Sequence, residues 1–585
     1  MATICDVLLR DMVRSGGSAL HKPKWTGAIR DKGTATIASL FETGARGLCL
    51  CAMLDAIGGL LPRRPLELEG WKVPKMNELT QSEGFTVSDL MARSRVPFGT
   101  SGVRGLASAM TDVLCHAYAT AFLQYLRQIG EFAPGDPVAI AGDLRESTPR
   151  ILAACATAVR DCGGEVINCG RTPTPALAFR AIGRGMASIM VTGSHIPADR
   201  NGIKFYRPHG EVLKSDEAGI VSQVVKAGDD RFGADGGLLD PAPLPEVVDV
   251  SQDYIDRYVR HFGAGALEGL TIGVYQHSAV GRDVLVRAVE ALGGVAVPFG
   301  RSEQFLPVDT EAIRQEDIEL AAQWARSNKV DAIISTDGDS DRPLVADASG
   351  TWLRGDIVGL LCARAVGADI VVTPVSSNTV LELSGAAPRV ARTRIGSPYV
   401  IAAMMDAATA DPSARVCGYE ANGGFLLGTD VGEGEGRLTA LPTRDALLPI
   451  IAVVRAARQR PLADILAELP PRFTFSDRVA EFPQAHSAAL IAFLSTGPED
   501  AQLARIARCF GEIAGLPIGI DTTDGYRMTF ADGSIIHFRP SGNAPELRCY
   551  TEAETEAKAR DLNARALKHV LEDVVPEAVK AQQDG

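Results

Sequence analysis

Short apolar runs alternate with helix-length segments from about residue 98 onward. Three of these runs predict buried strands, at residues 137–141, 165–168 and 188–191. Between them, residues 149–162 and 176–182 have the pattern of helices, the first with a proline at its start. Short apolar strands that alternate with helices indicate a parallel sheet covered by helices.

The same alternation begins again twice further along the chain. Residues 227–245 are rich in Gly, Asp and Pro, which predicts a linker or an exposed loop. The second unit is expected to contain strands at 271–275 and 331–335 and helices near 280–292 and 311–327. The third is expected to contain helices at 356–366 and 399–407 and strands at 369–373 and 415–418.

The last segment has a different pattern. Two alternating runs, 525–530 and 534–539, flank Asp532-Gly533, a dipeptide typical of a tight β-hairpin. A further strand is expected at 546–551 and an amphipathic helix at 554–574. This segment therefore predicts a small α+β domain.

Residues 1–90 lack this regular alternation, and we interpret them as an N-terminal extension that is partly disordered. The fold class predicted for the rest is three similar α/β domains followed by a smaller α+β domain. The predicted domains are an extension at 1–90, domain I at 91–245, domain II at 246–354, domain III at 355–470 and domain IV at 471–585.

Composition narrows the possible functions. The 585 residues carry a net charge of −13, which argues against a nucleic-acid partner and against a polybasic membrane-binding surface. The most apolar stretch, residues 47–62, contains Asp55 and is too short to cross a bilayer. The 11 cysteines are scattered without a CxxC pair, as expected of reduced thiols in a cytoplasmic protein.

Ser194 and Lys204 form the first chemical cluster, in a Gly- and Pro-containing turn after the predicted strand at 188–191. This turn places a hydroxyl at the carboxyl end of the sheet, where α/β proteins build their sites. A serine needs a positioned base or an electrophilic partner to act as a nucleophile. Taken alone, the turn and His195 are also compatible with a purely structural role.

Asp337, Asp339 and Asp341 directly follow the predicted strand at 331–335. Three carboxylates so close together repel one another unless a cation neutralises them, and oxygen ligands favour a hard ion such as Mg²⁺. An EF-hand is excluded because position 6 of such a loop would be Arg342 instead of glycine. Arg342 makes phosphate a plausible shared ligand, and a solvated acidic loop is the alternative.

Three further loops carry polar side chains among glycines. Glu420 and Asn422, in the sequence GYEANGG, have groups that accept and donate hydrogen bonds to hydroxyls, although a plain turn also explains them. Arg539 is followed by a Ser/Gly/Asn loop whose N–H groups suit an anion. Arg104 lies in a third such loop, FGTSGVRG.

The order of these motifs resembles the α-D-phosphohexomutase superfamily, the phosphoglucomutase/phosphomannomutase family. FGTSGVRG, TGSHIPADRNGIK, DGDSDR, GYEANGG and RPSGNAP occur in the family's order, and the resemblance covers about residues 96–575. The sequence at residues 393–399 is most similar to that of bacterial phosphomannomutases. The family implies a heart-shaped molecule whose four domains each contribute one loop to a central cleft.

The resemblance also implies an activity and residue roles. The activity would be interconversion of hexose 1-phosphate and hexose 6-phosphate, most simply of mannose phosphates, through a phosphoserine and a 1,6-bisphosphate. The implied catalytic residues are Ser194, His195, Lys204 and Arg104, and the implied Mg²⁺ ligands are Ser194, Asp337, Asp339 and Asp341. The implied substrate-binding residues are Arg342, Gly396, Ser397, Glu420, Asn422, Arg539, Ser541, Gly542 and Asn543.

Some residues depart from the family pattern. Gly424 stands where several phosphomannomutases have a catalytic histidine, and Asn543-Ala544 where many members have Thr-Glu. Phosphoglucomutase and phosphoglucosamine mutase activities therefore stay open, as does the general base. More distant alternatives are a haloacid-dehalogenase-type phosphatase with Asp337 as nucleophile and a non-catalytic sugar-phosphate sensor. The sequence does not predict an oligomeric state.

Overall fold

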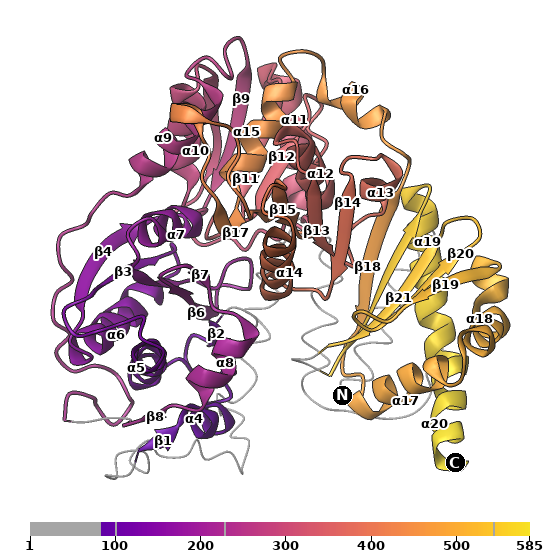
Figure 1. Cartoon of the computed structure of the whole chain (residues 1–585), viewed down its shortest axis with the longest axis horizontal. Coiled ribbons are helices and arrows are strands. Elements are labelled where there is room, and N and C mark those ends of the chain that lie inside the picture. Colours follow the sequence, from indigo (N-terminus) through magenta and orange to yellow (C-terminus); the bar gives the residue numbers. More distant parts are fainter. Residues whose placement is uncertain (1–83, 100–101, 227–229, 542–544, 585) are drawn as a thin grey trace, which may run out of the picture. The chain divides into compact units, whose positions relative to one another are not determined.

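The computed structural model of the chain describes residues 84–99, 102–226, 230–541 and 545–584. The described residues all belong to one structural unit. Within them the strands form four large sheets, which follow one another along the chain, and one two-stranded ribbon. Figure 1 shows helices beside each of the large sheets.

The first sheet has the strand order β2-β6-β5-β3-β4, with β7 paired to β6. Its parallel centre is extended by β6 and β2, which are antiparallel to their neighbours. The strands are β2 (Gly102–Leu106), β3 (Pro137–Gly142), β4 (Glu165–Arg171), β5 (Ala187–Val191), β6 (Arg200–Arg207) and β7 (Gly210–Glu211). The helices are α5 (Asp112–Gln128), α6 (Thr148–Asp161), α7 (Thr174–Ile182) and α8 (Lys214–Val221).

Both faces of this sheet are buried, which explains the continuous apolar runs of its central strands. Val138 and Ile140 of β3 pack in the core that contains α5 and α6. Ala139 and Ala141, which point to the other face, pack in the core that contains α7. Successive side chains of a strand point to opposite faces, so one strand serves two cores.

The second sheet has the order β10-β9-β11-β12 and the third the order β14-β13-β15-β16-β17. The second contains β9 (Thr271–His277), β10 (Val295–Arg301), β11 (Ala332–Thr336), β12 (Pro343–Ala346), α9 (Ser251–Phe262), α10 (Arg282–Ala291) and α11 (Gln315–Asn328). The third contains β13 (Ile370–Pro374), β14 (Arg389–Thr393), β15 (Val416–Tyr419), β16 (Phe425–Leu427), β17 (Leu441–Asp445), α12 (Gly355–Ala365), α13 (Val380–Leu383), α14 (Ser397–Ala410), α15 (Leu447–Ala456) and α16 (Leu462–Ala467).

The fourth sheet is antiparallel, with the order β18-β22-β21-β20-β19. The hairpin predicted around Asp532-Gly533 is confirmed, because β20 pairs with β21 and Gly533 takes the left-handed conformation, with φ +80°. The strands are β18 (Phe473–Val479), β19 (Pro517–Asp521), β20 (Tyr526–Phe530), β21 (Ile535–Pro540) and β22 (Leu547–Ala553). The helices are α17 (Gln484–Ser495), α18 (Glu499–Ala514), α19 (Glu556–His569) and α20 (Val575–Asp584).

The helices and strands around the first sheet begin earlier than the sequence pattern predicts. β1 (Phe85–Thr86) pairs with β8 (Val224–Val225), and α4 (Val87–Ser94) follows at once. Val87 is fully buried and Leu90 is nearly so, in the core of α5 and α6. Residues 85–90 fall in the range predicted for the extension, yet they are part of this core; residues 1–83 lie outside the described residues.

The sheets differ from the purely parallel arrangement that the sequence pattern predicts. In each of the first three, an antiparallel strand follows the polar loop: β6 after β5, β12 after β11 and β16 after β15. β6 was missed because it begins with Arg200, Asn201 and Gly202 of the loop, and β12 and β16 because they are only four and three residues long. The predicted domain boundaries at 245, 354 and 470 stay predictions.

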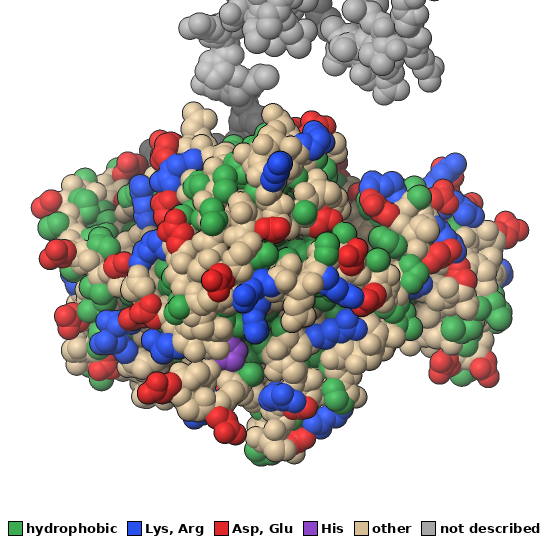
Figure 2. Space-filling view, turned by 90° about the horizontal axis from the view of Figure 1, so that it is seen from above, with side chains coloured by type: hydrophobic (Ala, Val, Ile, Leu, Met, Phe, Trp, Pro, Cys, Tyr) green, Lys and Arg blue, Asp and Glu red, His purple; other side chains and the backbone are tan. Residues whose placement is uncertain are grey.

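The surface of the described residues is mixed in character. Figure 2 shows acidic and basic side chains interspersed with apolar and uncharged ones over one face. Among the described helices, none combines the length and the apolar character needed to cross a bilayer.

Candidate active site

Ser194 lies in the loop that follows β5 and is completely buried. Its backbone takes the left-handed conformation, with φ +53°, a strained choice for a residue other than glycine. Its Oγ donates a hydrogen bond of 2.5 Å to Oδ2 of Asp337. The structure therefore joins the first two polar loops identified in the sequence through one direct contact.

Arg145 holds the loop that carries Ser194. All five of its N–H groups donate hydrogen bonds, and four of them go to main-chain carbonyls of this segment: Ser194 at 2.9 Å, Ile196 at 2.6 Å, Pro197 at 2.6 Å and Arg200 at 2.8 Å. The fifth, from Nε, goes to Asp143 at 3.1 Å. A guanidinium that is saturated in this way fixes the backbone on which the serine sits.

Asp143 supports the same loop through a second set of hydrogen bonds. Its Oδ2 accepts from the Oγ1 of Thr192 at 2.8 Å, and this Oγ1 accepts from the N–H of Ser194 at 2.7 Å. The ring of Phe305, from the segment after β10, lies 3.9 Å from the Arg145 guanidinium carbon. A Cβ at Gly193 would come within 2.6 Å of that carbon, so only glycine fits beside it.

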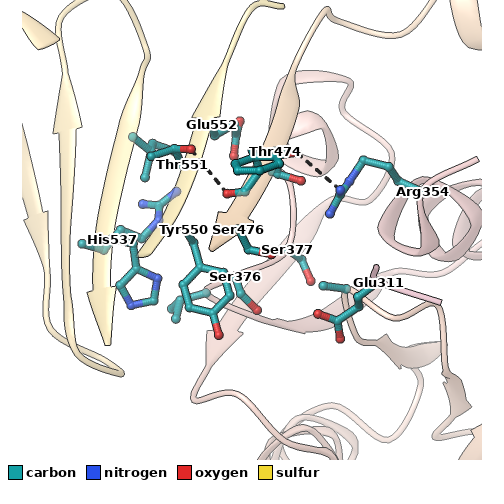
Figure 3. Close-up of a pocket in the computed structure, with 15 residues that line it drawn as sticks. Glu311, Arg354, Ser376, Ser377, Thr474, Ser476, His537, Tyr550, Thr551 and Glu552 are labelled. Atoms are coloured by element: carbon teal, nitrogen blue, oxygen red, sulfur yellow. Dashed lines mark hydrogen bonds between the residues drawn. The ribbon is translucent and has the colours of Figure 1, made fainter. Parts of the chain in front are cut away.

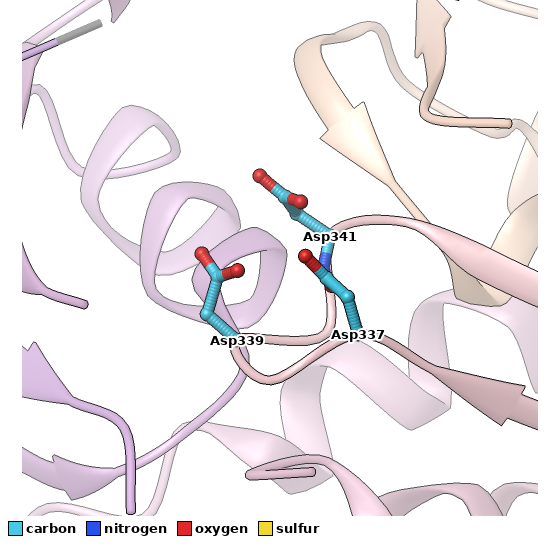
Figure 4. Close-up of side chains that lie close together, drawn as sticks. All are labelled: Asp337, Asp339 and Asp341. Carbon is cyan, nitrogen blue, oxygen red and sulfur yellow. The ribbon is translucent and has the colours of Figure 1, made fainter. Parts of the chain in front are cut away.

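Asp337, Asp339 and Asp341 follow β11 and are fully buried (Figure 4). One carboxylate oxygen from each lies within 4.8 Å of the others. Burial and the two neighbouring carboxylates hold the pKa of Asp337 well above its usual range. This mutual repulsion is the condition that a bound cation relieves.

The donor set of the triad fits a metal ion. The Oδ1 atoms of Asp339 and Asp341 are buried and have no hydrogen-bond partner. A cation that accepts electron pairs from these oxygens would offset the desolvation cost of the two atoms, which no hydrogen bond relieves. Carboxylate oxygens alone suit a hard divalent ion.

Lys204 and Thr174 make the remaining contacts of the triad. The ammonium of Lys204, on β6, donates to Oδ2 of Asp339 and to Oδ2 of Asp341, both at 2.6 Å. The hydroxyl of Thr174, at the start of α7, donates to Oδ2 of Asp339 at 2.6 Å. The predicted pairing of Lys204 with the serine loop is thus, in this structure, a pairing with the aspartates.

Three arginines surround these groups. Burial lowers the pKa of Arg104 to about 10, and the charges of Arg342 and Arg444 add to this effect. The carboxylates of Asp341, Glu211 and Glu420 outweigh burial at Arg444 and hold its pKa above the usual range. Cations that repel one another at close quarters are typical of a site built for an anion such as phosphate.

His195 is held in its neutral form. Arg342 donates to its Nδ1 over 2.9 Å, and the Oγ of Ser194 lies 3.3 Å from the same nitrogen. Burial lowers the pKa of His195 to about 2, with Arg342 and Arg104 contributing. Its predicted catalytic role stays a prediction, and the geometry favours orientation of Arg342.

Glu420 of the third loop reaches the triad through Arg444. Nη1 of Arg444 donates to Oε2 of Glu420 at 3.1 Å and Nε donates to Oδ2 of Asp341 at 3.0 Å. Asn422 caps its own turn, because its Oδ1 accepts from the N–H of Gly424 at 2.9 Å. Gly396 precedes α14 with φ +134°, and the hydroxyl of Ser397 donates to Glu211 at 2.8 Å.

The fourth loop is only partly described. Nε of Arg539 donates to Oδ2 of Asp524 at 2.8 Å, and Ser541 is buried, with its N–H bound to the carbonyl of Glu546 at 2.9 Å. Gly542 and Asn543, which complete the predicted phosphate loop, lie outside the described residues.

A pocket lies between the third and fourth sheets, next to the loop at 418–424 that carries Glu420 and Asn422 (Figure 3). Ala421, Arg354 and Ser377 come from the side of the third sheet, and His537 and Tyr550 from the fourth. The rings of His537 and Tyr550 stack with centroids 5.3 Å apart. Ala421, which follows Glu420, is the residue by which this pocket adjoins the third loop.

Sequence reasoning missed Asp143, Arg145, Thr174 and Arg444. Asp143 and Arg145 follow the buried strand β3 in the same way that Ser194 follows β5, which is a signal the pattern contained. Arg444 lies in β17 next to Asp445, three positions before the apolar helix α15, and no signal in the sequence pattern distinguishes it.

A buried hydroxyl beside carboxylates that fit a metal, under a cluster of cations, defines an enzyme that handles phosphoryl groups. Models of four domains match the chain, described as phosphoglucomutase/phosphomannomutase alpha/beta/alpha domains I, II and III and the C-terminal domain. They cover residues 95–231, 252–350, 354–473 and 489–569. The chain therefore belongs to the phosphoglucomutase/phosphomannomutase family.

Individual relatives agree with this assignment. A protein of Sinorhizobium fredii named phosphomannomutase is 46% identical over 473 residues, which is 80% of this chain and 98% of the relative. One of Salmonella muenchen with the same name is 41% identical over 491 residues, 83% of this chain and 98% of the relative. A phosphoglucomutase/phosphomannomutase family protein of Burkholderia thailandensis has the same fold, with a TM-score of 0.62 at 20% identity over 82% of this chain and 98% of that chain.

These comparisons confirm three predictions made from the sequence: the family, the fold class of three α/β domains and a C-terminal domain, and the enzyme class, an isomerase of the phosphohexomutase type.

Proposed function

We propose that the protein interconverts mannose 1-phosphate and mannose 6-phosphate through a phosphoserine at Ser194 and a mannose 1,6-bisphosphate. The observation that carries this proposal is the 2.5 Å contact between Ser194 Oγ and Asp337 within the aspartate triad. A hydroxyl that accepts and donates a phosphoryl group needs a cation beside it, because charge neutralisation and positioning account for most of the catalysis of this transfer.

Asp337, Asp339, Asp341 and the oxygen of Ser194 are the residues we assign to Mg²⁺. When bound, the ion would neutralise charge on the phosphoryl group that Ser194 carries. Lys204, Arg104, Arg342 and Arg444 already oppose the carboxylates of the triad and Glu420. A divalent cation in addition leaves the site with an excess of positive charge, which suits a phosphate dianion.

The transfer needs no reactant other than the phosphoserine and the sugar phosphate. The bond between Ser194 Oγ and phosphorus breaks, and a bond forms from the free hydroxyl oxygen of the sugar phosphate to the same phosphorus. The proton of that hydroxyl finally replaces the phosphoryl group on Ser194 Oγ, and we assign its handling to Lys204 and Arg104. The bisphosphate then turns around, and the reverse transfer from its other phosphate gives the isomer and restores the phosphoserine.

The remaining predicted residues are assigned to binding. Glu420 and Asn422 would take the sugar hydroxyls, assisted by Gly396 and Ser397. The phosphate that does not react would lie on Arg539, Ser541, Gly542 and Asn543, with Arg342 beside the reacting one. We place the reaction in the cytoplasm, where the eight described cysteines, all free, would stay reduced.

The test compares kcat/KM for mannose 1-phosphate, glucose 1-phosphate and glucosamine 1-phosphate, each with its 1,6-bisphosphate as activator. The proposal expects mannose 1-phosphate to be the best substrate and phosphate to be recovered on Ser194. A higher kcat/KM for glucosamine 1-phosphate would make the protein a phosphoglucosamine mutase. Phosphate trapped on Asp337 would instead indicate the phosphatase chemistry.

A further inference from the structure

Arg444 stands at the meeting point of three loops. It lies near the end of β17 and is only 4% exposed. Its Nε donates to Asp341 of the loop at 337–342, here called the metal loop, at 3.0 Å. Its Nη1 donates to Glu420 of the loop at 418–424, here called the sugar loop, at 3.1 Å and to the hydroxyl of Ser397 at 3.3 Å. One planar guanidinium thus contacts a triad carboxylate and a sugar-loop carboxylate at once.

The surroundings of Arg444 are shaped for this side chain. A Cβ at Gly424 would lie 2.7 Å from the Cδ and 2.8 Å from the Cγ of Arg444. Carbon atoms do not approach so closely without displacement, so the glycine at 424 makes room for the arginine stem. The sugar loop and Arg444 therefore fit each other as a pair.

Glu211 is linked to Arg444 through the hydroxyl of Ser397. Its carboxylate accepts from the hydroxyl of Ser397 at 2.8 Å and from that of Thr443 at 2.7 Å. Ser397 is left with its oxygen lone pair toward Arg444. Since β7 with Glu211 belongs to the first sheet, this chain of contacts ties the first sheet to the metal loop of the second and the sugar loop of the third.

We propose that Arg444 is a positioning residue that sets the Glu420 carboxylate relative to the metal loop, and thereby couples recognition of the sugar to the metal site. The proposal rests on the proposed function for the identity of the sugar phosphate. The carboxylate of Glu420 has Arg444 as its hydrogen-bonding partner, and a carboxylate so buried depends on such a partner for its orientation.

Two properties of the arginine are separable by substitution. Its positive charge weakens the binding of a cation such as Mg²⁺ at Asp341, whereas the fork of its N–H donors orients the carboxylate of Glu420. Arg444→Lys keeps the charge and loses the fork, because one ammonium on a flexible stem does not match both carboxylates. Arg444→Met loses both, and Gly424→Ala keeps the arginine but pushes on its stem.

The test uses the full-length protein with two readouts: Mg²⁺ affinity measured by calorimetry without substrate, and the mannose to glucose ratio of kcat/KM. We expect Arg444→Met to bind Mg²⁺ about tenfold more tightly, because a repelling charge beside the ligands is gone. We expect Arg444→Lys and Gly424→Ala to keep the wild-type Mg²⁺ affinity, to lower kcat/KM about 10- to 100-fold and to change the sugar ratio.

Arg257→Lys is the matched control, because Arg257 is also 4% exposed and binds Thr439 through two hydrogen bonds outside the site. It should leave the Mg²⁺ affinity and the sugar ratio unchanged. The proposal is overturned if Arg444→Lys and Gly424→Ala, shown to be folded by circular dichroism, keep the wild-type sugar ratio. It is also overturned if Arg444→Met does not tighten Mg²⁺ binding.

A failure of the proposed function looks different. In that case the wild-type protein itself would not turn over mannose 1-phosphate. The coupling is then measured by binding alone, as the change in Mg²⁺ affinity when glucose 1-phosphate or glucosamine 1-phosphate is present. Loss of that change in Arg444→Lys supports the role of Arg444, and its persistence overturns it.

Discussion

Ser194 Oγ donates a hydrogen bond of 2.5 Å to Oδ2 of Asp337, although 143 positions separate the two residues along the chain. The contact joins the ends of two parallel strands, β5 and β11, that belong to different sheets. Gly338 makes the approach possible, because a Cβ there would lie 2.6 Å from the carbonyl oxygen of Ser194. Ser194 and the aspartate triad therefore form one unit.

Replacing Ser194 by alanine should abolish turnover. The loop is held by the backbone contacts of Arg145 and Thr192, so loss of one hydroxyl should leave the fold intact. We expect kcat to fall by more than about 10⁴-fold, with an unchanged melting temperature. Phosphopeptide mapping of the wild type should recover phosphate on Ser194. Ser349→Ala, in an exposed turn, is the control and should behave like the wild type.

Asp339→Asn should weaken Mg²⁺ binding by at least about 100-fold, because it removes one negative charge from the triad and replaces a carboxylate oxygen by an NH₂ group that cannot bind a cation. Calorimetric titration of the metal checks this directly. Chelation of the wild type should stop turnover and added Mg²⁺ should restore it. Asp283→Asn, which alters an exposed pair with Arg301, should bind the metal normally. Full activity of Asp339→Asn without metal would count against the site.

Arg145→Lys should impair catalysis more than binding. A lysine supplies three donors in place of five and lets the Ser194 backbone relax from its left-handed conformation. We expect kcat to fall about 10- to 100-fold with KM changed less than about threefold, since a displaced nucleophile costs rate more than affinity. Arg301→Lys, at an exposed ion pair, should change neither constant. If kcat falls only as far as the loss of thermal stability explains, Arg145 has a purely structural role.

Much of the fold could be predicted because its central strands are buried on both faces. The segments 138–141, 189–191 and 332–334 are continuous apolar runs, and a run of this kind has few alternatives to a parallel strand. The antiparallel β6 was missed because it contains Lys204 and Arg200, whose charges hide an otherwise buried strand. Burial of Lys204 is possible only because two aspartates from another sheet neutralise it, which local sequence does not show.

The residues of the candidate site could likewise be predicted only in part. Ser194 and the aspartates could be found because each follows a strand within a few residues. Arg444 could not, because its partners Asp341 and Glu420 are 103 and 24 positions away and its space depends on Gly424. Contacts between loops of different sheets are set by tertiary packing, and a single sequence contains no local pattern for them.

The contribution of β1 and the start of α4 to stability is testable by truncation. A protein that begins at Gly84 should keep both fold and turnover, because every described site residue lies beyond it. One that begins at Met91 loses Val87, Leu90 and the capping box of Thr86 and Asp89. We expect a loss of about 3–6 kcal/mol in the free energy of unfolding from the two buried side chains. Equal stability of the two proteins in urea would show that β1 and the start of α4 are dispensable.

Glu420→Gln should separate sugar recognition from phosphoryl transfer. The substitution keeps the shape of the side chain but removes the charge that Arg444 contacts at 3.1 Å. A buried hydroxyl or guanidinium that loses its partner costs about 1–3 kcal/mol, or roughly 5- to 150-fold in kcat/KM. Mannose and glucose differ at the 2-hydroxyl, so the ratio of their kcat/KM values should change if Glu420 contacts that position. The control is Glu468→Gln, which alters an exposed pair with Arg460 and should change neither rate nor ratio. If Glu420→Gln changes no ratio and no rate, the assignment of this loop to the sugar is wrong, and the walls of the pocket near His537 and Tyr550 become the place to look for it.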